Sequence, residues 1–208
     1  MNTTIFEMVK TGKMNDIAGA VAASLEAGEP ALDTLDTMVS AMAEIGEGFK
    51  NGTVFIPEML LGAMTMQAGV AVLKPHLGSG EANKLGKFVM GTVYGDLHDV
   101  GKNLVIMMVE SAGFEVVDLG IDVSVEKFVN AVESDEAVNV VGVSALLTTT
   151  LPAMEKVVEA LNASPARSRI KVMVGGAPVT QAFADKIGAD AYTADAASAA
   201  EKAAELAK

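Results

Sequence analysis

One of the two histidines in this sequence lies in a glycine-bounded segment suited to metal binding. The 208 residues contain no cysteine, which excludes thiolate nucleophiles, iron–sulfur clusters and cysteine zinc sites. His98 follows an apolar run between Gly95 and Gly101, and Asp96 precedes it by two residues. A carboxylate at that spacing can hold one ring nitrogen as an N–H donor and leave the other nitrogen for a metal. The spacing therefore predicts a metal-ligating histidine at position 98.

The same residues also allow a plainer interpretation, in which Asp96 caps the next helix and His98 hydrogen-bonds to backbone. A lone histidine does not make a zinc site, which needs about four donors. A macrocyclic cofactor brings its own equatorial nitrogens and needs only one axial ligand from the protein. The other histidine, His76, adjoins Pro75 at the end of a predicted helix, where a cation suits the helix dipole, and we expect it to have no ligand role.

Two halves of the chain differ in the periodicity of their apolar residues. Helical spacing predicts four helices, over residues 5–9, 14–25, 31–49 and 56–73. From residue 86 onward, short apolar runs at 88–94, 114–118, 138–143, 170–174 and 189–192 alternate with helical stretches. This alternation is typical of a doubly wound, five-stranded parallel sheet of the flavodoxin or Rossmann type. We expect an α + α/β protein, with a four-helix domain at 1–85 and an α/β domain at 86–208.

Ligands of such sheets bind at the carboxyl ends of the strands, so the loops there are candidate sites. The loop after the predicted third strand carries four hydroxyls, which either cap the following helix or hydrogen-bond a cofactor and Asp96. They are Ser144, Thr148, Thr149 and Thr150. Gly175 and Gly176 follow the fourth strand, where they either form a tight turn or let a base or phosphate approach the backbone.

The charge of the chain excludes several classes of partner. It has 15 basic and 27 acidic residues, a formal charge of -12, which disfavours nucleic acid and anionic lipid. The first ten residues lack an apolar signal core, and we find no apolar run long enough to span a bilayer. We therefore expect a cytoplasmic protein without nucleic-acid or membrane partners.

Several segments together resemble the cobalamin-binding module of methionine synthase. They read GDLHDVGKN at 95–103, VSAL at 143–146 and GG at 175–176. The earlier segments GEGF at 46–49 and FIPEML at 55–60 are similar to the helical cap of that module, so the resemblance covers nearly the whole chain. A free-standing cap and corrinoid domain resembles the corrinoid proteins of anaerobic, corrinoid-dependent methyltransferase systems. The resemblance implies a cap domain at 1–85 and a cobalamin-binding domain at 86–208.

This resemblance also implies roles for individual residues. His98 would be the axial cobalt ligand of cobalamin or a related corrinoid in the base-off/His-on state, carried as methylcobalamin. Asp96 would hydrogen-bond His98. Thr150 would be the third member of this hydrogen-bonded relay, at a position where methionine synthase has serine. The implied cofactor contacts are Gly95, Leu97, Asp99, Val100, Gly101, Ser144, Leu146, Thr148, Thr149, Gly175, Gly176, Ala177, Ala194 and Asp195. Apolar residues Ile56, Met59, Leu60 and Met64 would either cover the methyl face of the corrin or form a bundle core.

The resemblance further implies a methyl carrier without catalytic residues of its own. It would accept a methyl group from a donor-specific methyltransferase, pass it to a second methyltransferase that uses tetrahydrofolate or coenzyme M, and need a reductive activator of its cobalt. The donor stays open among methylamines, betaines, methanol and aryl methyl ethers. A hinge is expected at 75–84. Two alternatives remain: a cobalamin-responsive sensor or regulator, and a flavodoxin-like domain that binds a phosphate ligand or flavin.

Overall fold

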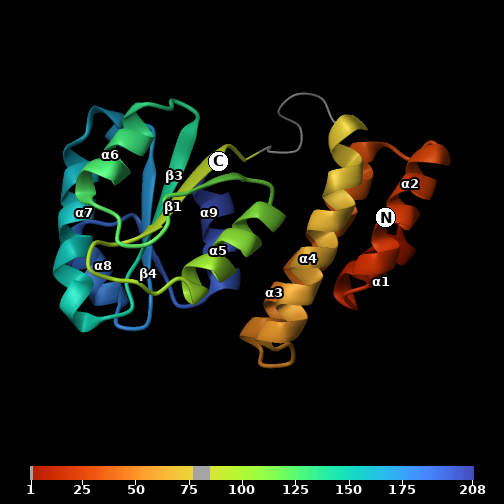
Figure 1. Ribbon diagram of the computed structural model, residues 1–208, viewed down its shortest axis with the longest axis horizontal. Helices are drawn as coiled ribbons and strands as arrows, with labels where there is room; N and C mark the ends of the chain where they lie inside the picture. Colours follow the sequence, from red (N-terminus) through yellow and green to blue (C-terminus); the bar gives the residue numbers. More distant parts are fainter. Residues whose placement is uncertain (1, 77–84) are drawn as a thin grey trace. The chain divides into compact units, whose positions relative to one another are not determined.

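Two compact units make up the chain in the computed structural model, which describes residues 2–76 and 85–208 (Figure 1). The helical unit comprises Met1–Lys84 together with Ser111–Gly113, and the sheet unit comprises Leu85–Glu110 and Phe114–Lys208. Most of the hinge expected at 75–84 falls outside the described residues, so that hinge stays a prediction.

The helical unit contains the four predicted helices. They are α1 (Thr3–Lys10), α2 (Met14–Glu26), α3 (Ala31–Lys50) and α4 (Ile56–Leu73), followed by a short 3-10 helix, η1 (Lys74–His76). Gly12, Gly28 and Gly52, which lie between successive helices, all have the positive φ that suits a turn. Helical periodicity alone was therefore enough to find these elements.

One face of α4 packs closely inside the bundle. A Cβ atom added to Gly62 would lie 2.5 Å from Cδ1 of Ile45, and one added to Gly69 would lie 2.7 Å from Sδ of Met38. Met59 and Met66 share this face and are buried. The small residues thus allow the helices to approach closely.

The expectation that no apolar run could span a bilayer was wrong for α4. Among the described residues, this helix of 18 residues is long and apolar enough to cross a membrane by length and composition. Its Met59–Met66 face packs against neighbouring helices, and the core helix of a bundle meets the same criteria. We take α4 as a bundle helix and as no sign of a membrane span.

The sheet unit contains the predicted five-stranded parallel sheet, and the structure gives its strand order as β2-β1-β3-β4-β5. Its described strands are β1 (Lys87–Thr92), β2 (Glu115–Asp118), β3 (Val138–Ser144), β4 (Lys171–Gly175) and β5 (Ala191–Thr193). The helices between and after them are α5 (Val100–Ser111), α6 (Val125–Glu133), α7 (Leu151–Ala163), α8 (Gln181–Ile187) and α9 (Ala196–Leu206). Figure 1 shows α5 and α9 on one face of the sheet and α6, α7 and α8 on the other, which is the doubly wound arrangement.

Strand order determines which loops meet. β1 pairs with β2 on one side and with β3 on the other, so the chain reverses its direction through the sheet between β1 and β3. The backbone N–H of Val93, just after β1, donates to the carbonyl of Ser144 at 3.0 Å. The loops after β1 and β3 therefore lie side by side at the switch point where such sheets bind ligands.

Candidate functional site

The loop after β1 presents His98 in a defined orientation. Nδ1 of His98 lies 2.7 Å from Oδ1 of Asp96, which also accepts the backbone N–H of His98 at 3.2 Å. The hydroxyl of Thr92 donates to the carbonyl of His98 at 2.9 Å, and α5 begins two residues later at Val100. The His98 side chain is 50% exposed. Because Nδ1 faces Asp96, Nε2 is the ring nitrogen that a ligand can reach.

Asp96 is fully buried and accepts hydrogen bonds from two loops. Its Oδ2 receives the backbone N–H of Leu146 at 2.7 Å, that of Leu147 at 3.3 Å and the hydroxyl of Thr150 at 2.8 Å. Burial alone would raise the pKa of the Asp96 carboxyl, but the bonds from Leu146, His98 and Thr150 together lower this pKa far below its usual range. The group is therefore a carboxylate, and the proton between Asp96 and His98 resides on Nδ1.

These contacts argue against the plainer interpretation, in which Asp96 caps the next helix. Its oxygens bind the N–H groups of His98, Leu146 and Leu147, none of which belongs to α5. The structure thus brings Asp96, His98 and Thr150 into one connected network, with Thr150 supplied from the short 3-10 helix η3 (Thr148–Thr150).

Large apolar side chains are exposed around this network. They are Tyr94, Leu97, Val100, Ile121, Leu146 and Leu147. Leu97, Val100 and Leu146 were predicted as cofactor contacts, whereas Tyr94, Ile121 and Leu147 were missed. In the sequence, each of these three missed residues is an apolar residue in or at the edge of a predicted loop, near polar residues, and this position could have identified them. Exposed apolar side chains that gather on loops of one sheet edge indicate a surface that a largely apolar ligand covers.

The turn after β4 lets two backbone segments approach each other closely. Gly176 has φ +125°, and a Cβ added to it would lie 1.9 Å from the carbonyl oxygen of Ala145. A Cβ on Gly175 would lie 3.2 Å from the carbonyl oxygen of Thr193. Ala177 and Ala194 are exposed beside this turn. The close packing against Ala145 therefore explains why position 176 is a glycine, without reference to any ligand.

The other predicted site residues divide between surface and internal roles. Thr148 and Thr149 are exposed and Ser144 is half-buried. Both carboxylate oxygens of Asp195 cap α9, since they accept the N–H and the hydroxyl of Ser198 at 2.8 Å each. The remaining predicted residues of the loop, Gly95, Asp99 and Gly101, are exposed around His98.

The predicted cap residues on α4 do not all share one face. Met59 is buried, whereas Ile56 and Met64 are 45% and 44% exposed and Leu60 is partly exposed. Met59 belongs to the packed face that contains Gly62 and Gly69, as the bundle-core alternative predicts. Ile56, Leu60 and Met64 are the members of this set with surface that a ligand could contact.

A buried lysine beside the histidine loop was not predicted from the sequence. Lys102 lies in the first turn of α5 and is only 3% exposed. Its Nζ donates to both carboxylate oxygens of Asp118, at 2.8 and 2.7 Å, and to Oδ1 of Asn103 at 2.7 Å. The ion pair connects the start of α5 to the end of β2, and the residues around Lys102 in this turn, Val100, Gly101 and Asn103, are exposed, so the sequence carries no signal for its burial.

The residues fit a macrocyclic metal cofactor better than a bare ion. Among residues 2–76 and 85–208, no group of three or more acidic or histidine side chains could hold a metal ion. His98 supplies one reachable nitrogen, and exposed apolar residues lie on the loops around it. One axial nitrogen is what a corrinoid requires of the protein, since its ring provides the equatorial ligands.

A helical unit followed by this sheet unit, with a single histidine at the switch point, is the architecture of a cobalamin-binding protein. B12 binding domain families match residues 86–204 and residues 2–74. Dimethylamine corrinoid protein 2 of Methanosarcina mazei is 46% identical over 195 residues, which are 93% of this chain and 91% of that protein. The chain belongs to the B12-binding corrinoid proteins of methyltransferase systems, and its cofactor is cobalamin or a related corrinoid.

Solved structures agree with this assignment. A cobalamin-binding protein from Desulfitobacterium hafniense DCB-2 has a TM-score of 0.83 at 33% identity, covering 98% of this chain and 97% of that one. The methanol:cobalamin methyltransferase complex MtaBC from Methanosarcina barkeri contains a chain with a TM-score of 0.83 at 28% identity, covering 98% and 78%. In the second structure the related chain is part of a methyltransferase complex.

Proposed function

We propose that this protein carries a methyl group on the cobalt of a corrinoid, with Nε2 of His98 as the axial ligand in a base-off/His-on state. The observation that carries the proposal is the network in which Asp96 holds Nδ1 of His98 at 2.7 Å while the ring stays half exposed. A histidine held in this way has a defined tautomer and direction, which a metal ligand requires.

Each polar residue of the network has a distinct task in this proposal. The bound corrinoid supplies the cobalt chemistry, alternately accepting and releasing the methyl group. Asp96 keeps the proton on Nδ1 and increases the basicity of Nε2, and it does so as a carboxylate because five hydrogen bonds stabilise its charge. Thr150 keeps Oδ2 of Asp96 in place. Because Nδ1 holds its proton toward Asp96, Nε2 is the atom of His98 that would hold the cobalt.

The rest of the proposed site binds the remainder of the cofactor. The bare backbone of Gly175 and Gly176, with Ser144 and Leu146, would line the site of the nucleotide tail, and Ala177 and Ala194 would border it. Exposed Leu97 and Val100, on the histidine loop, would contact the corrin ring. Ile56, Leu60 and Met64 on α4 form the apolar surface that we propose excludes water from the methyl group.

The partners are proposed from the relatives. Dimethylamine corrinoid protein 2 matches 46% of aligned residues, which favours a methylamine-specific methyltransferase as the donor partner over a methanol-specific one. A second methyltransferase would pass the group to tetrahydrofolate or coenzyme M, and a reductive activator would restore oxidised cobalt. We place these reactions in the cytoplasm. A pull-down of the donor methyltransferase from the source cells would test this partner.

The two histidines provide a matched test of the ligand role. Apo protein reconstituted with cobalamin should turn red and retain equimolar cobalt with the spectrum of a base-off, histidine-ligated cofactor. His98→Ala should lose that spectrum and bind the corrinoid about 10- to 100-fold more weakly. His76→Ala, which changes an exposed histidine of the helical unit, should behave as wild type.

Three outcomes would contradict the proposal. An unchanged spectrum and unchanged methyl transfer in His98→Ala would exclude this residue as the ligand. Uptake of flavin by a protein that stays colourless with cobalamin would favour the flavodoxin-like alternative. Corrinoid-dependent binding to DNA, without methyl transfer, would favour a sensor.

A further inference from the structure

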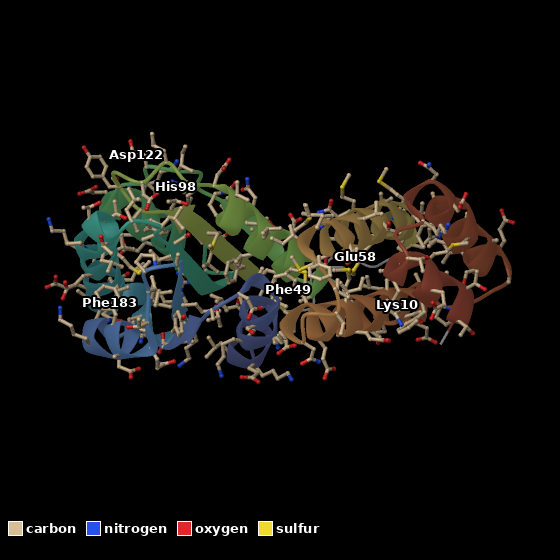
Figure 2. All side chains as sticks on the ribbon, turned by 90° about the horizontal axis from the view of Figure 1, so that it is seen from below. Lys10, Phe49, Glu58, His98, Asp122 and Phe183 are labelled. Atoms are coloured by element: carbon tan, nitrogen blue, oxygen red, sulfur yellow. The ribbon has the colours of Figure 1, made fainter. Side chains whose placement is uncertain are left out.

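The loop between β2 and α6 holds the backbone of the histidine loop through Asp122. Oδ1 of Asp122 accepts the backbone N–H of Gly95 at 2.7 Å. The backbone N–H of Asp122 donates to the carbonyl of Asp96 at 3.1 Å. One residue thus binds the Gly95–Asp96 dipeptide at both ends, and the Asp96 side chain that orients His98 extends from this dipeptide. Figure 2 shows His98 and Asp122 at the same end of the sheet unit.

The backbone conformation of Asp122 is needed for this double contact. Among residues 2–76 and 85–208, Asp122 is the one residue other than glycine with a positive φ, +52°. Aspartate and asparagine tolerate this left-handed region better than most residues, and alanine does not share that tolerance. A residue held in an uncommon conformation beside a functional loop points to a role in that loop.

We call the two hydrogen bonds between Asp122 and the Gly95–Asp96 dipeptide the clamp. The β2–α6 loop, which contains Asp122, is itself hydrogen-bonded to β1. The N–H of Val123 donates to the carbonyl of Thr92, and the N–H of Thr92 donates to the carbonyl of Gly120, each at 3.0 Å. Nζ of Lys127 donates to the carbonyl of Leu119 at 2.8 Å. Movement of Gly95 would therefore be resisted by the sheet through Asp122.

Local helix capping does not account for the Asp122 side chain. Helix α6 is capped by Ser124, whose side chain accepts the N–H of Lys127. The Asp122 carboxylate is exposed and instead reaches a loop 27 residues away in the sequence. Its contacts serve the histidine loop.

We propose that Asp122 is a positioning residue for His98, which holds the Gly95–Asp96 backbone so that the imidazole meets the axial position of the corrinoid. The inference rests on the proposed ligand role of His98. Asp122 touches neither the ring nor, in this proposal, the cofactor. Its loss should release the loop and shift the balance from histidine-bound to histidine-free cobalt.

Three substitutions at one position separate the hydrogen bond from the backbone conformation. Asp122→Asn keeps an acceptor oxygen and tolerates the left-handed region. Asp122→Gly keeps the conformation, and therefore the fold, but removes the acceptor. Asp122→Ala removes both. Asp185→Ala changes another exposed aspartate, on α8, and is the matched control.

The apo protein gives the first measurement, because hydrogen exchange at the Gly95 amide reports the clamp directly. Exchange should be at least about tenfold faster in Asp122→Gly and Asp122→Ala than in wild type, and unchanged in Asp122→Asn and Asp185→Ala. Equal exchange in wild type and Asp122→Gly would overturn the inference.

The second measurement reports axial coordination without requiring methyl transfer. In full-length protein loaded with cobinamide, a corrinoid that lacks the nucleotide base, an axial nitrogen on cobalt(II) comes from the protein and splits the electron paramagnetic resonance lines. The ratio of nitrogen-bound to nitrogen-free cobalt should fall about tenfold in the Gly and Ala variants and be restored in Asp122→Asn. His98→Ala gives the unsplit baseline.

The outcomes distinguish the two proposals. Wild-type protein without nitrogen splitting would remove the ligand role of His98 itself. Wild-type protein with splitting, and an Asp122→Gly variant with the same splitting, would overturn the positioning role alone. Loss of splitting in Asp122→Asn, equal to that in Asp122→Gly, would also contradict the hydrogen-bond explanation.

Discussion

Two regions at the same edge of the sheet, the loop after β1 and the turn after β4, are held in place by different interactions. The loop after β1 is held by polar bonds, with Asp96 as the acceptor for five of them. The turn after β4 is held by close backbone packing, where Gly176 has no room for a side chain against Ala145. The first region fixes the direction of the His98 imidazole, and the second brings the backbone segments at Ala145 and Gly176 into close contact.

The contrast shows what each task demands physically. The metal ligand that we propose at His98 must point in one direction, and direction comes from hydrogen bonds whose geometry is specific. Two backbone segments can pack this closely only where one of them has no Cβ atom, which is the case at Gly176. Substitutions in the first region should therefore act through lost partners, and substitutions in the second through steric overlap.

The largest effect is expected from removing the buried acceptor. Asp96→Ala leaves the N–H groups of Leu146 and Leu147 without their acceptor, and should lower the free energy of unfolding of the sheet unit by about 3–5 kcal/mol. Urea unfolding followed by the near-ultraviolet circular dichroism of tyrosine measures this unit selectively, because Tyr94 and Tyr192 are the two tyrosines and the chain has no tryptophan. A loss below about 1 kcal/mol, similar to that in Asp185→Ala, would contradict the network.

Acid titration of stability tests the same carboxylate. The pKa of Asp96 is lower in the folded protein than the value of about 3.9 in an unfolded chain, so its contribution is complete above that value. It is lost as the pH falls from about 4 toward the folded pKa. Wild type should therefore lose up to about 1.4 kcal/mol more per pH unit than Asp96→Ala in this range. Parallel curves for the two proteins would show that Asp96 is not held as a carboxylate.

An intermediate effect is expected at the crowded glycine. Gly176→Ala places a methyl group against the carbonyl of Ala145 and forces an unfavourable φ, and should cost about 3 kcal/mol. Gly101→Ala is the matched control, since a Cβ there meets nothing within 4 Å and the residue lies in α5. The control should gain about 0.5–1 kcal/mol. Equal effects in the two variants, measured by the same tyrosine signal, would remove the distinction between the regions.

The smallest effect is expected from a single hydroxyl. Thr150→Val removes the donor to Oδ2 of Asp96 and should cost about 1–2 kcal/mol, while Thr150→Ser keeps the hydroxyl and should stay within about 0.5 kcal/mol of wild type. With one donor fewer, the pKa of Asp96 should rise in the valine variant, which moves the acid transition to higher pH. Equal stability of the valine and serine variants would mean that the bond contributes nothing.

Much of this fold could be predicted from the sequence. The four helices and the alternating strands follow from apolar periodicity, and the observed strand ends differ from the expected ones by at most two residues. The roles of particular side chains were harder to predict. Met59 and Met64 look alike in the sequence, yet one lies on the packed face of α4 and the other on its exposed face. Asp195 caps α9 in the structure, a role that was not predicted, and its expected cofactor contact stays a prediction.

The sequence by itself determined the order of the elements and the pairing of Asp96 with His98, because both depend on spacing along a few residues. The Thr150 hydroxyl was one of several possible partners of Asp96 in the sequence, and only the tertiary structure decided which groups bind this carboxylate. Thr150 lies 54 residues away, and the donors at Leu146 and Leu147 are backbone groups that any residue would carry. The parallel pairing of β1 with β3 brings these groups to one carboxylate. The same holds for Asp122, whose contact with Gly95 depends on the register between β1 and the chain beyond β2.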